Sequence, residues 1–461
     1  MPLSNNQKKK RKQQQRHTHK RKCFDLMKKI LLPLLLFICF RSSAQQVLTL
    51  QEAVATALQN NYDILLSKND SMVAALDYSY RNAVFLPRLN GVIGDNWTRN
   101  QQNQEFSTGT KREGKVKTNN INAAVNLNWV LFDGLKMFAI RDKAAEFIRL
   151  GELGIKDQVV NTVATVVNTY YNIVRQKQQL RAVEEQMSIS QIRVDLAERR
   201  LDIGVGTKPD VLQSKVDLNA QKAEQFEAQA LIAQLKERLN MLMNTARTSE
   251  YDVADSIPLN MNLDIDDVRR DIENTSPQLQ IYRKNIDIAN ITLRERKAER
   301  LPIVSFNSAY NFSKTNNDVA LNPALPIFNQ NKGFNYGLSA SIPILNNFNA
   351  KRLVEQAKLD IKYQQLFYEN QLLQVNTFVL VAYREYEQQR KALILEEENI
   401  LLAKENVSIA LEVYRLGGST IIQLREAQKS LEDAYNRLID ARYNTKLSET
   451  ELLRIRGALI R

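Results

Sequence analysis

The strongest constraint on the fold is an internal repeat that covers most of the 461-residue chain. Gly204 and Gly417 lie 213 positions apart (417 − 204 = 213), and each opens a Gly-rich break between two helical patterns. Further features recur at this spacing or at 215: Thr207 and Thr420, Asp210 and Gln423, Leu218 and Leu431, Ala74 and Ala289, Pro87 and Pro302, and segments 129–134 and 342–347. Shared Leu and Ala periodicity is the alternative explanation, but it does not account for the Pro, Gly and strand matches. The pattern predicts a tandem duplication, with structural repeats over 45–257 and 258–461.

Each Gly-rich break is typical of a tight corner between two helices. Gly417 and Gly418 are able to adopt the left-handed dihedrals that end a helix. Thr420 and Gln423 have the spacing of a capping box, in which the hydroxyl and the amide side chain satisfy backbone groups reciprocally. We expect the matching corner at residues 201–211 to have the same construction.

Helical patterns of unusual length enter both corners. The first covers about 135–201 without a proline, and at 1.5 Å per residue it predicts a helix of roughly 100 Å. Its apolar residues follow coiled-coil spacing, which predicts a packed seam. The seam residues are Val159, Val163, Val166, Tyr170 and Ile173. The other predicted helices cover about 49–60, 61–86, 276–301 and 349–416, with return helices that end near 244 and 457.

Four shorter segments alternate with the period of a β-strand. They cover about 89–98, 121–129, 303–312 and 334–342, and loops are expected over 99–119 and 313–333. One face of each strand is apolar and aromatic, and the other consists mainly of Asn, Ser, Ala and Gly. Nine or ten tilted residues suffice to cross the apolar core of a bilayer. A soluble, half-buried sheet is the alternative, but its second face would normally carry charges.

Four strands are too few to close a barrel around a lumen, and open sheet edges are not tolerated in lipid. We therefore expect the barrel to be shared between identical chains, with polar side chains around a water-filled interior. The long helices, too polar to cross lipid, would project from one side as a coiled-coil tube. The predicted fold class is α+β, mostly α.

A net charge of +13 is typical of a nucleic-acid binder, but the distribution of the charge along the chain argues against that function. Residues 1–44 contain twelve of the 64 basic residues and one of the 51 acidic ones, which leaves 52 and 50, a net +2, for the remainder. Residues 27–44 have the pattern of a secretory signal peptide that is cut after Ala44. Residues 1–26 form a basic extension, interpreted as sequence upstream of a true start at Met27. A nucleic-acid-binding or nuclear-targeting tail is the alternative.

These features together resemble the TolC family of outer-membrane efflux proteins over essentially all of residues 45–461. The motifs that carry the resemblance are Thr49-Leu50-Gln51-Glu52-Ala53, Leu86-Pro87, Leu301-Pro302, Leu131-Phe132-Asp133-Gly134, Gly204-x-x-Thr207-x-x-Asp210 and Gly417-x-x-Thr420-x-x-Gln423. Each motif is weak alone, and the ordered, duplicated set is specific. The chain departs from the family pattern at two positions: Val130 occupies a position where Pro is common in the family, and Asn347 occupies the position that matches Gly134 of the first half.

The resemblance implies a homotrimer with a twelve-stranded outer-membrane barrel on a periplasmic α-helical tunnel. It also implies two partners, a periplasmic adaptor and an inner-membrane transporter. The adaptor would contact the helical corners, at Gly204, Gly206, Thr207, Gly417, Gly418, Ser419 and Thr420.

The resemblance also implies that the corners close the periplasmic entrance. Tyr414 and Asp210 would form the link that holds it shut, and Gln423 and Glu426 would line the constriction. Two carboxylates are usual at the last two positions, so Gln423 weakens any expected cation-binding ring. A capping role alone is the alternative for Asp210 and Gln423.

Catalytic chemistry is not expected. Both His and both Cys residues lie within 1–44, so the mature chain has neither of the residue types used by common zinc sites and Cys or Ser-His nucleophiles. We expect no enzyme, no cofactor, no metal and no nucleic-acid partner. The predicted function is a passive exit duct for small molecules in a tripartite efflux system. A duct for type I protein secretion and a non-conducting periplasmic coiled-coil scaffold are the alternatives.

Overall fold

The computed structural model describes residues 47–245, 251–321 and 326–459. The predicted signal peptide, its cleavage site and the basic extension lie outside these residues. The chain divides into two units. In the described part of the first unit, β1 (Val47–Leu48) and β4 (Asp252–Val253) pair in parallel. The second unit, residues 50–246 and 255–461, contains all the long elements and is described below.

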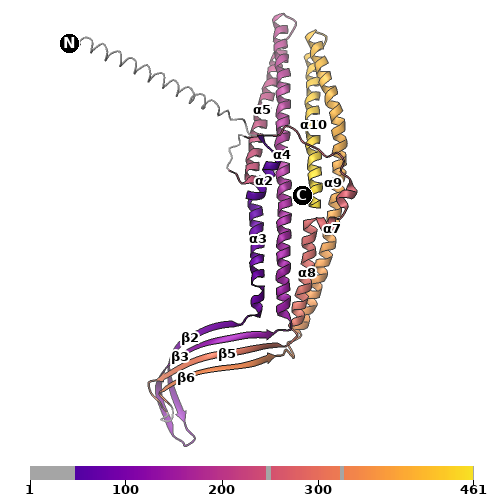
Figure 1. Ribbon diagram of the computed structural model, residues 1–461. Helices are drawn as coiled ribbons and strands as arrows, with labels where there is room; N and C mark the ends of the chain where they lie inside the picture. The colour runs from indigo at the N-terminus through magenta and orange to yellow at the C-terminus, as the bar shows by residue number, and fades with distance from the viewer. Residues whose placement is uncertain (1–46, 246–250, 322–325, 460–461) are drawn as a thin grey trace, which may run out of the picture. The chain divides into compact units, whose positions relative to one another are not determined.

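Two helical hairpins of matching length form most of the second unit (Figure 1). The first consists of α4 (Lys136–Asp202, 67 residues) and α5 (Lys208–Met243, 36 residues). The second consists of α9 (Asn349–Arg415, 67 residues) and α10 (Ile421–Arg456, 36 residues). The long helices predicted from both halves of the sequence are therefore present, and the two hairpins have equal lengths.

Shorter helices pack along the long ones. They are α2 (Leu50–Asn60), α3 (Tyr62–Ser79), α6 (Ile265–Arg269), α7 (Ile272–Thr275) and α8 (Pro277–Ala298). Asn61 begins α3, because its side chain accepts from the amides of Asp63 and Ile64. The helix predicted to continue to 86 ends earlier, at Ser79. A 3₁₀ turn, η1 (Arg81–Phe85), replaces its last turns, and Leu86 is extended before Pro87.

The apolar seam of α4 is buried as the spacing predicted. Val163, Val166, Tyr170 and Ile173 are at most 3% exposed, whereas Val159 is half-buried. The second hairpin has a corresponding core between α9 and α10, formed by residues such as Leu393, Val407, Leu431 and Leu438. Most of the stability of such long helices comes from this packing rather than from helix propensity.

The four strands form one antiparallel sheet in the order β2-β3-β5-β6. The strands are longer than predicted: β2 covers Arg88–Glu105, β3 Lys111–Phe132, β5 Ile303–Asn317 and β6 Phe328–Ser341. Most of the expected loop 99–119 and both ends of the expected loop 313–333 are strand. The prediction was wrong there because it followed apolar alternation, whereas backbone pairing across a hairpin also accommodates polar residues.

The register places the four apolar strand faces on one side of the sheet. Leu89 pairs with Leu127, Val125 pairs with Tyr310, and Tyr310 pairs in turn with Phe334. These side chains are exposed, with Leu89 67% and Phe334 66% accessible. A sheet with one large apolar face uncovered requires a further apolar environment, which is a lipid bilayer or another chain.

The strand-to-helix bends are equivalent in the two halves. Gly134 and Leu135 both have positive φ, and so do Asn347 and Phe348. Asn is one of the few non-glycine residues that adopts this conformation readily, so Asn347 can replace the expected Gly. The register of β3 against β5 shifts between Val130 and Phe132, where Val130 replaces the expected Pro.

Candidate functional site

The corner between α9 and α10 has the predicted capping box. Gly417 has φ +81°, and the Gly418 amide donates to the Val413 carbonyl over 2.9 Å, which closes the end of α9. Thr420 Oγ1 then accepts from the Gln423 amide, while the Gln423 side chain accepts from the Thr420 amide over 3.0 Å. Local sequence alone determines this corner.

The corner between α4 and α5 is similar but its cap differs. Gly204 has φ +78°, and the Gly206 amide donates to the Arg200 carbonyl over 2.8 Å. Thr207 accepts from the Asp210 amide and donates its hydroxyl to Asp210 Oδ2 over 2.7 Å. The Asp210 carboxylate therefore orients the capping hydroxyl, whereas Gln423 accepts a backbone amide.

Both corners contribute to one cavity of about 530 Å³. Asp210, Tyr414 and Gln423, three of the four predicted aperture residues, line it together with Arg200. Gly206, Gly417, Gly418, Ser419 and Thr420 also line it. Gly204, Thr207 and Glu426 do not. The structure thus brings the predicted Tyr414 and Asp210 to one cavity within a single chain.

Tyr414 is almost fully buried at this cavity, with 4% of its surface exposed. Arg200 Nη1 donates to the Tyr414 carbonyl over 3.1 Å, and its guanidinium carbon lies 4.9 Å from the ring centre. Burial raises the pKa of the Tyr414 phenol, and the Asp210 carboxylate adds to this effect, whereas Arg200 opposes it. The phenol therefore remains protonated and can donate a hydrogen bond.

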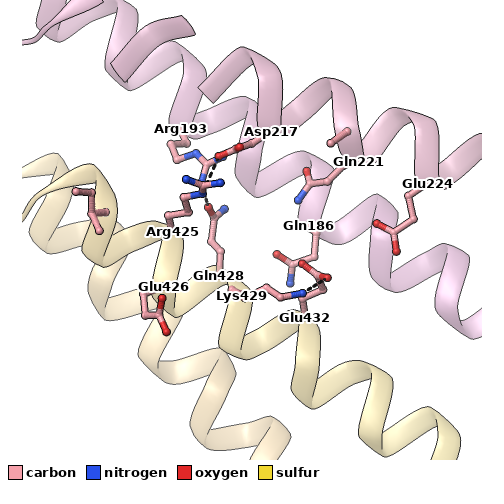
Figure 2. A pocket seen from close by; sticks show the side chains of 12 residues that line it. Gln186, Arg193, Asp217, Gln221, Glu224, Arg425, Glu426, Gln428, Lys429 and Glu432 are labelled. Carbon is pink, nitrogen blue, oxygen red and sulfur yellow. Dashed lines mark hydrogen bonds and ion pairs between the residues drawn. The ribbon is translucent and has the colours of Figure 1, made fainter. Parts of the chain in front are cut away.

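A second cavity, of about 520 Å³, lies between α4 and α5 on one side and α10 on the other (Figure 2). Glu426, the fourth predicted aperture residue, lines this cavity instead of the first. At one end of it, four side chains form a connected group that we call the Arg193 cluster. Its members are Arg193, Asp217, Arg425 and Gln428.

The Arg193 cluster joins three helices. Arg193 on α4 is 2% exposed, and it donates to Asp217 on α5 over 2.8 Å and to Gln428 on α10 over 2.6 Å. Arg425 on α10 also contacts Asp217, at 3.2 Å. Burial lowers the pKa of the Arg193 guanidinium, and the Asp217 carboxylate opposes this effect. One carboxylate thus holds two guanidinium groups at the junction of the two hairpins.

Sequence reasoning did not identify the Arg193 cluster. Part of it had a signal, because Arg193 precedes Gly204 by eleven positions (204 − 193) and Asp217 follows it by thirteen (217 − 204). Residues at similar distances from the corner of an antiparallel hairpin meet, so this pair could have been found. Nothing in the sequence indicates that Gln428 and Arg425 reach the same point.

The described residues contain no grouping of three or more His, Cys, Asp or Glu side chains that could hold a metal ion. Among the described helices, none combines the length and the apolar character that a transmembrane helix needs.

A family model described as "Outer membrane efflux protein" matches residues 53–245 and 268–458. The "Outer membrane protein TolC" of Vibrio cholerae is 22% identical over 432 residues, covering 91% of this chain and 92% of its own length. The "Probable efflux pump outer membrane protein TtgC" of Pseudomonas putida is 22% identical over 423 residues, covering 88% and 82%.

The fold is shared with solved channel structures. The crystal structure of the Campylobacter jejuni CmeC outer membrane channel matches with a TM-score of 0.73 at 17% identity, covering 89% of this chain and 86% of that one. The two segments that match the family model end at corresponding places, 245 and 458, each two residues beyond the last residue of α5 or α10 (245 − 243 = 458 − 456 = 2).

Proposed function

The chain belongs to the outer membrane efflux protein family and is an outer-membrane exit duct of efflux systems, and we propose that three copies assemble into the working channel. The topology supports this assembly, because β2 and β6 end the sheet and, among the residues that the structure describes, each has one edge without a partner strand. Open edges are not stable in lipid, so each β2 would pair with the β6 of a neighbouring copy. Twelve strands would then close around a lumen lined by Asn, Ser and Thr.

The duplication fits the same assembly. We infer that residues 45–257 and 258–461 are structural repeats, since α4 and α9 have 67 residues each, and α5 and α10 have 36 each. Two equal hairpins per copy would give a helical tunnel with six similar hairpins. Such a tunnel needs little adjustment at the boundary between copies.

We propose a periplasmic adaptor and an inner-membrane transporter as the partners. Large apolar side chains at both corners are more than 60% exposed, which suits a protein contact. These are Ile203, Val205, Leu416 and Ile422. Together with the predicted corner residues, from Gly204 to Thr207 and from Gly417 to Thr420, they would receive the adaptor.

The aperture proposal rests on the cavity that Asp210, Tyr414 and Gln423 share. In the closed state the protonated Tyr414 phenol would donate to Asp210, and Gln423 and Glu426 would narrow the entrance. Capping remains a second role for Asp210 and Gln423, since both contact the Thr at the start of their helix.

Small molecules are the proposed substrates. The name of the Pseudomonas putida relative, which describes a probable efflux pump protein, supports this proposal. Protein secretion is the second candidate. A transport assay in cells that lack their own duct, with a toxic dye and a secreted protein as separate cargoes, distinguishes the two.

The decisive experiment uses the full-length protein, purified in detergent. We expect a particle with the mass of three chains that conducts ions in a planar bilayer. A monomeric, water-soluble and non-conducting protein would support a coiled-coil scaffold instead. In the same bilayers, Tyr414→Phe combined with Asp210→Ala should raise the single-channel conductance, and an unchanged conductance would reject the latch.

A further inference from the structure

The two strand hairpins continue well beyond the length that a membrane requires. Strands β2 and β3 have 18 and 22 residues, and β5 and β6 have 15 and 14. About 9–11 tilted residues cross the apolar core of a bilayer. The ends near the turns, which are farthest from the helices, therefore lie at the level of the lipid headgroups and above it.

The register shows which face the charged residues of the first hairpin occupy. Trp97 belongs to the exposed apolar face and is 75% accessible. Arg99 follows it by two positions, so it lies on the same face, and it pairs with Lys117. Lys115 lies two positions from Lys117 and continues this row.

The second hairpin has the same arrangement. Phe312 belongs to the apolar face, and Lys332 on β6 pairs with it directly. Lys314 follows Phe312 by two positions on β5, so it lies on the same face. The Lys332 ammonium is 5.8 Å from the Phe312 ring centre, and the Lys314 ammonium is 5.8 Å from that of Phe328. Lysine stems that lie along aromatic rings at a membrane boundary extend their charge toward the headgroups.

We call these five outward-facing cations the basic girdle: Arg99, Lys115, Lys117, Lys314 and Lys332. Carboxylates on the same face neutralise them only in part. Glu113 lies there, two positions from Lys115, and its carboxylate accepts from the Gln101 amide over 2.9 Å, while Glu105 farther out pairs with Lys111. Lys117 is 3.9 Å from Asp318, and the structure records no ion pair for the other four within the described residues. Asp95, on the same face, accepts from the Trp97 indole over 3.0 Å. Five cations against Asp95, Glu113 and Asp318 leave this region of the outer face with a net charge of +2 (5 − 3 = 2).

The girdle faces away from the lumen. On the opposite face, the strand segments 96–104, 114–122, 311–317 and 329–333 carry no charged residue. Arg112, which pairs with Gln104 just beyond them, is engaged by the Leu321 carbonyl, to which its guanidinium donates over 2.6 Å. Cations that attracted a transported anion would be expected on that inner face. Placed on the outer face, directly beyond the aromatic residues, they match the anionic headgroup layer instead.

We propose that the basic girdle binds phosphate groups of lipid headgroups in the outer leaflet. The inference rests on the proposed trimeric barrel, which puts the strand hairpins on the outside of the cell and repeats the five cations around the rim. Each bound phosphate would lie between cations of adjacent strands, and it would hold a layer of anionic lipid around the channel.

The test uses the full-length trimer in nanodiscs of phosphatidylcholine, with or without phosphatidic acid as the phosphomonoester probe. Retained lipid is measured by native mass spectrometry. We expect the wild type to retain phosphatidic acid in preference to phosphatidylcholine, and rising salt to weaken this preference because it screens exposed charges. Replacing all five girdle residues by Gln should reduce the preference roughly tenfold or more.

A matched control loses the same charge elsewhere. It replaces five exposed lysines of the helices by Gln: Lys208, Lys222, Lys351, Lys362 and Lys391. The preference should survive in this variant. A wild type without a preference, or an equal loss in the control, would overturn the inference.

A measurement of pore formation distinguishes failure of the girdle proposal from failure of the proposed function. All the variants are also recorded in planar bilayers. A conducting trimer that shows no phosphate preference refutes the girdle alone, whereas a wild type that neither trimerises nor conducts refutes the assembly beneath it. The comparison of phosphatidic acid with phosphatidylcholine in the wild type needs no variant, so the proposal can still be tested if the girdle variant misfolds.

Discussion

At the scale of single residues, the capping box was predictable and the Arg193 cluster was not. Thr420 and Gln423 are three positions apart, so their contact depends on helix geometry alone. Arg193 meets Gln428 across 235 positions of sequence, and this contact depends on how two hairpins pack. A buried arginine with two polar partners is thus a consequence of tertiary structure.

Asp217→Asn should destabilise the protein strongly. The substitution leaves the buried Arg193 guanidinium without its carboxylate, and such a loss costs about 3–5 kcal/mol. The measurement is the temperature at which the purified protein, the proposed trimer, dissociates, supported by urea unfolding.

Glu198→Gln is the matched control for Asp217→Asn, since it also removes one carboxylate from the α4–α5 hairpin. Glu198 pairs with Lys215 at the surface, with side chains that are 44% and 51% exposed. Exposed pairs contribute about 0–1 kcal/mol, so little should change. Equal effects of the two substitutions would contradict the role assigned to the Arg193 cluster.

At the scale of elements, the sequence predicted helices better than strand ends. Helix boundaries have local signals, such as Thr207, Thr420 and Ser276-Pro277, and the observed helices begin there. The outer ends of the strands have none. Gln101 pairs with Lys115, and its amide donates to the Glu113 carboxylate, so polar residues extend the ladder without apolar alternation.

The α4–α5 corner should tolerate a side chain at Gly204 better than at Gly206. A Cβ at Gly204 would meet no atom within 4 Å. Gly204→Ala should therefore lower the stability only by the free energy that a residue with a side chain needs to adopt the left-handed conformation, roughly 1–2 kcal/mol. A Cβ at Gly206 would lie 2.8 Å from the Leu201 nitrogen and 2.9 Å from the Arg200 carbonyl carbon. Since both are backbone atoms, the corner itself must open.

Hydrogen exchange of the corner amides measures this difference. Gly206→Ala should accelerate exchange of the amides that donate to the Arg200 carbonyl, whereas Gly204→Asn should leave them near the wild-type rate because Asn accepts positive φ. Equal exchange in the two variants would show that the corner is looser than its hydrogen bonds indicate.

At the scale of the whole molecule, the apolar sheet face determines where the chain resides. Its side chains are exposed in the single chain, and closing the sheet edges between copies would leave that face toward lipid. The opposite face would then line the water-filled path. Adjacent residues of one strand would thus face lipid and water respectively, so the same substitution at two neighbouring positions should have different effects.

Val125→Arg and Ala124→Arg should differ in effect although they are neighbours on β3. Val125 lies on the apolar face between Gly91 and Tyr310, where an arginine near the bilayer midplane costs about 2–4 kcal/mol. Ala124 lies on the opposite face, where an arginine should preserve the proposed trimer and change ion selectivity. Heat stability of the trimer and the reversal potential in planar bilayers measure the two effects.

If Val125→Arg left the trimer as stable as Ala124→Arg does, the apolar face would not contact lipid. A water-soluble sheet would then be the better explanation.

The sequence by itself predicted the duplication and determined the long helices, the corners and the apolar alternation of the strands, because each depends on residues within a few positions of one another or on a repeated spacing. Only the tertiary structure decided the Arg193 cluster, the full strand lengths and the face that carries the basic girdle. Those features depend on register and on packing between segments far apart in the chain, for which a single sequence holds no local signal.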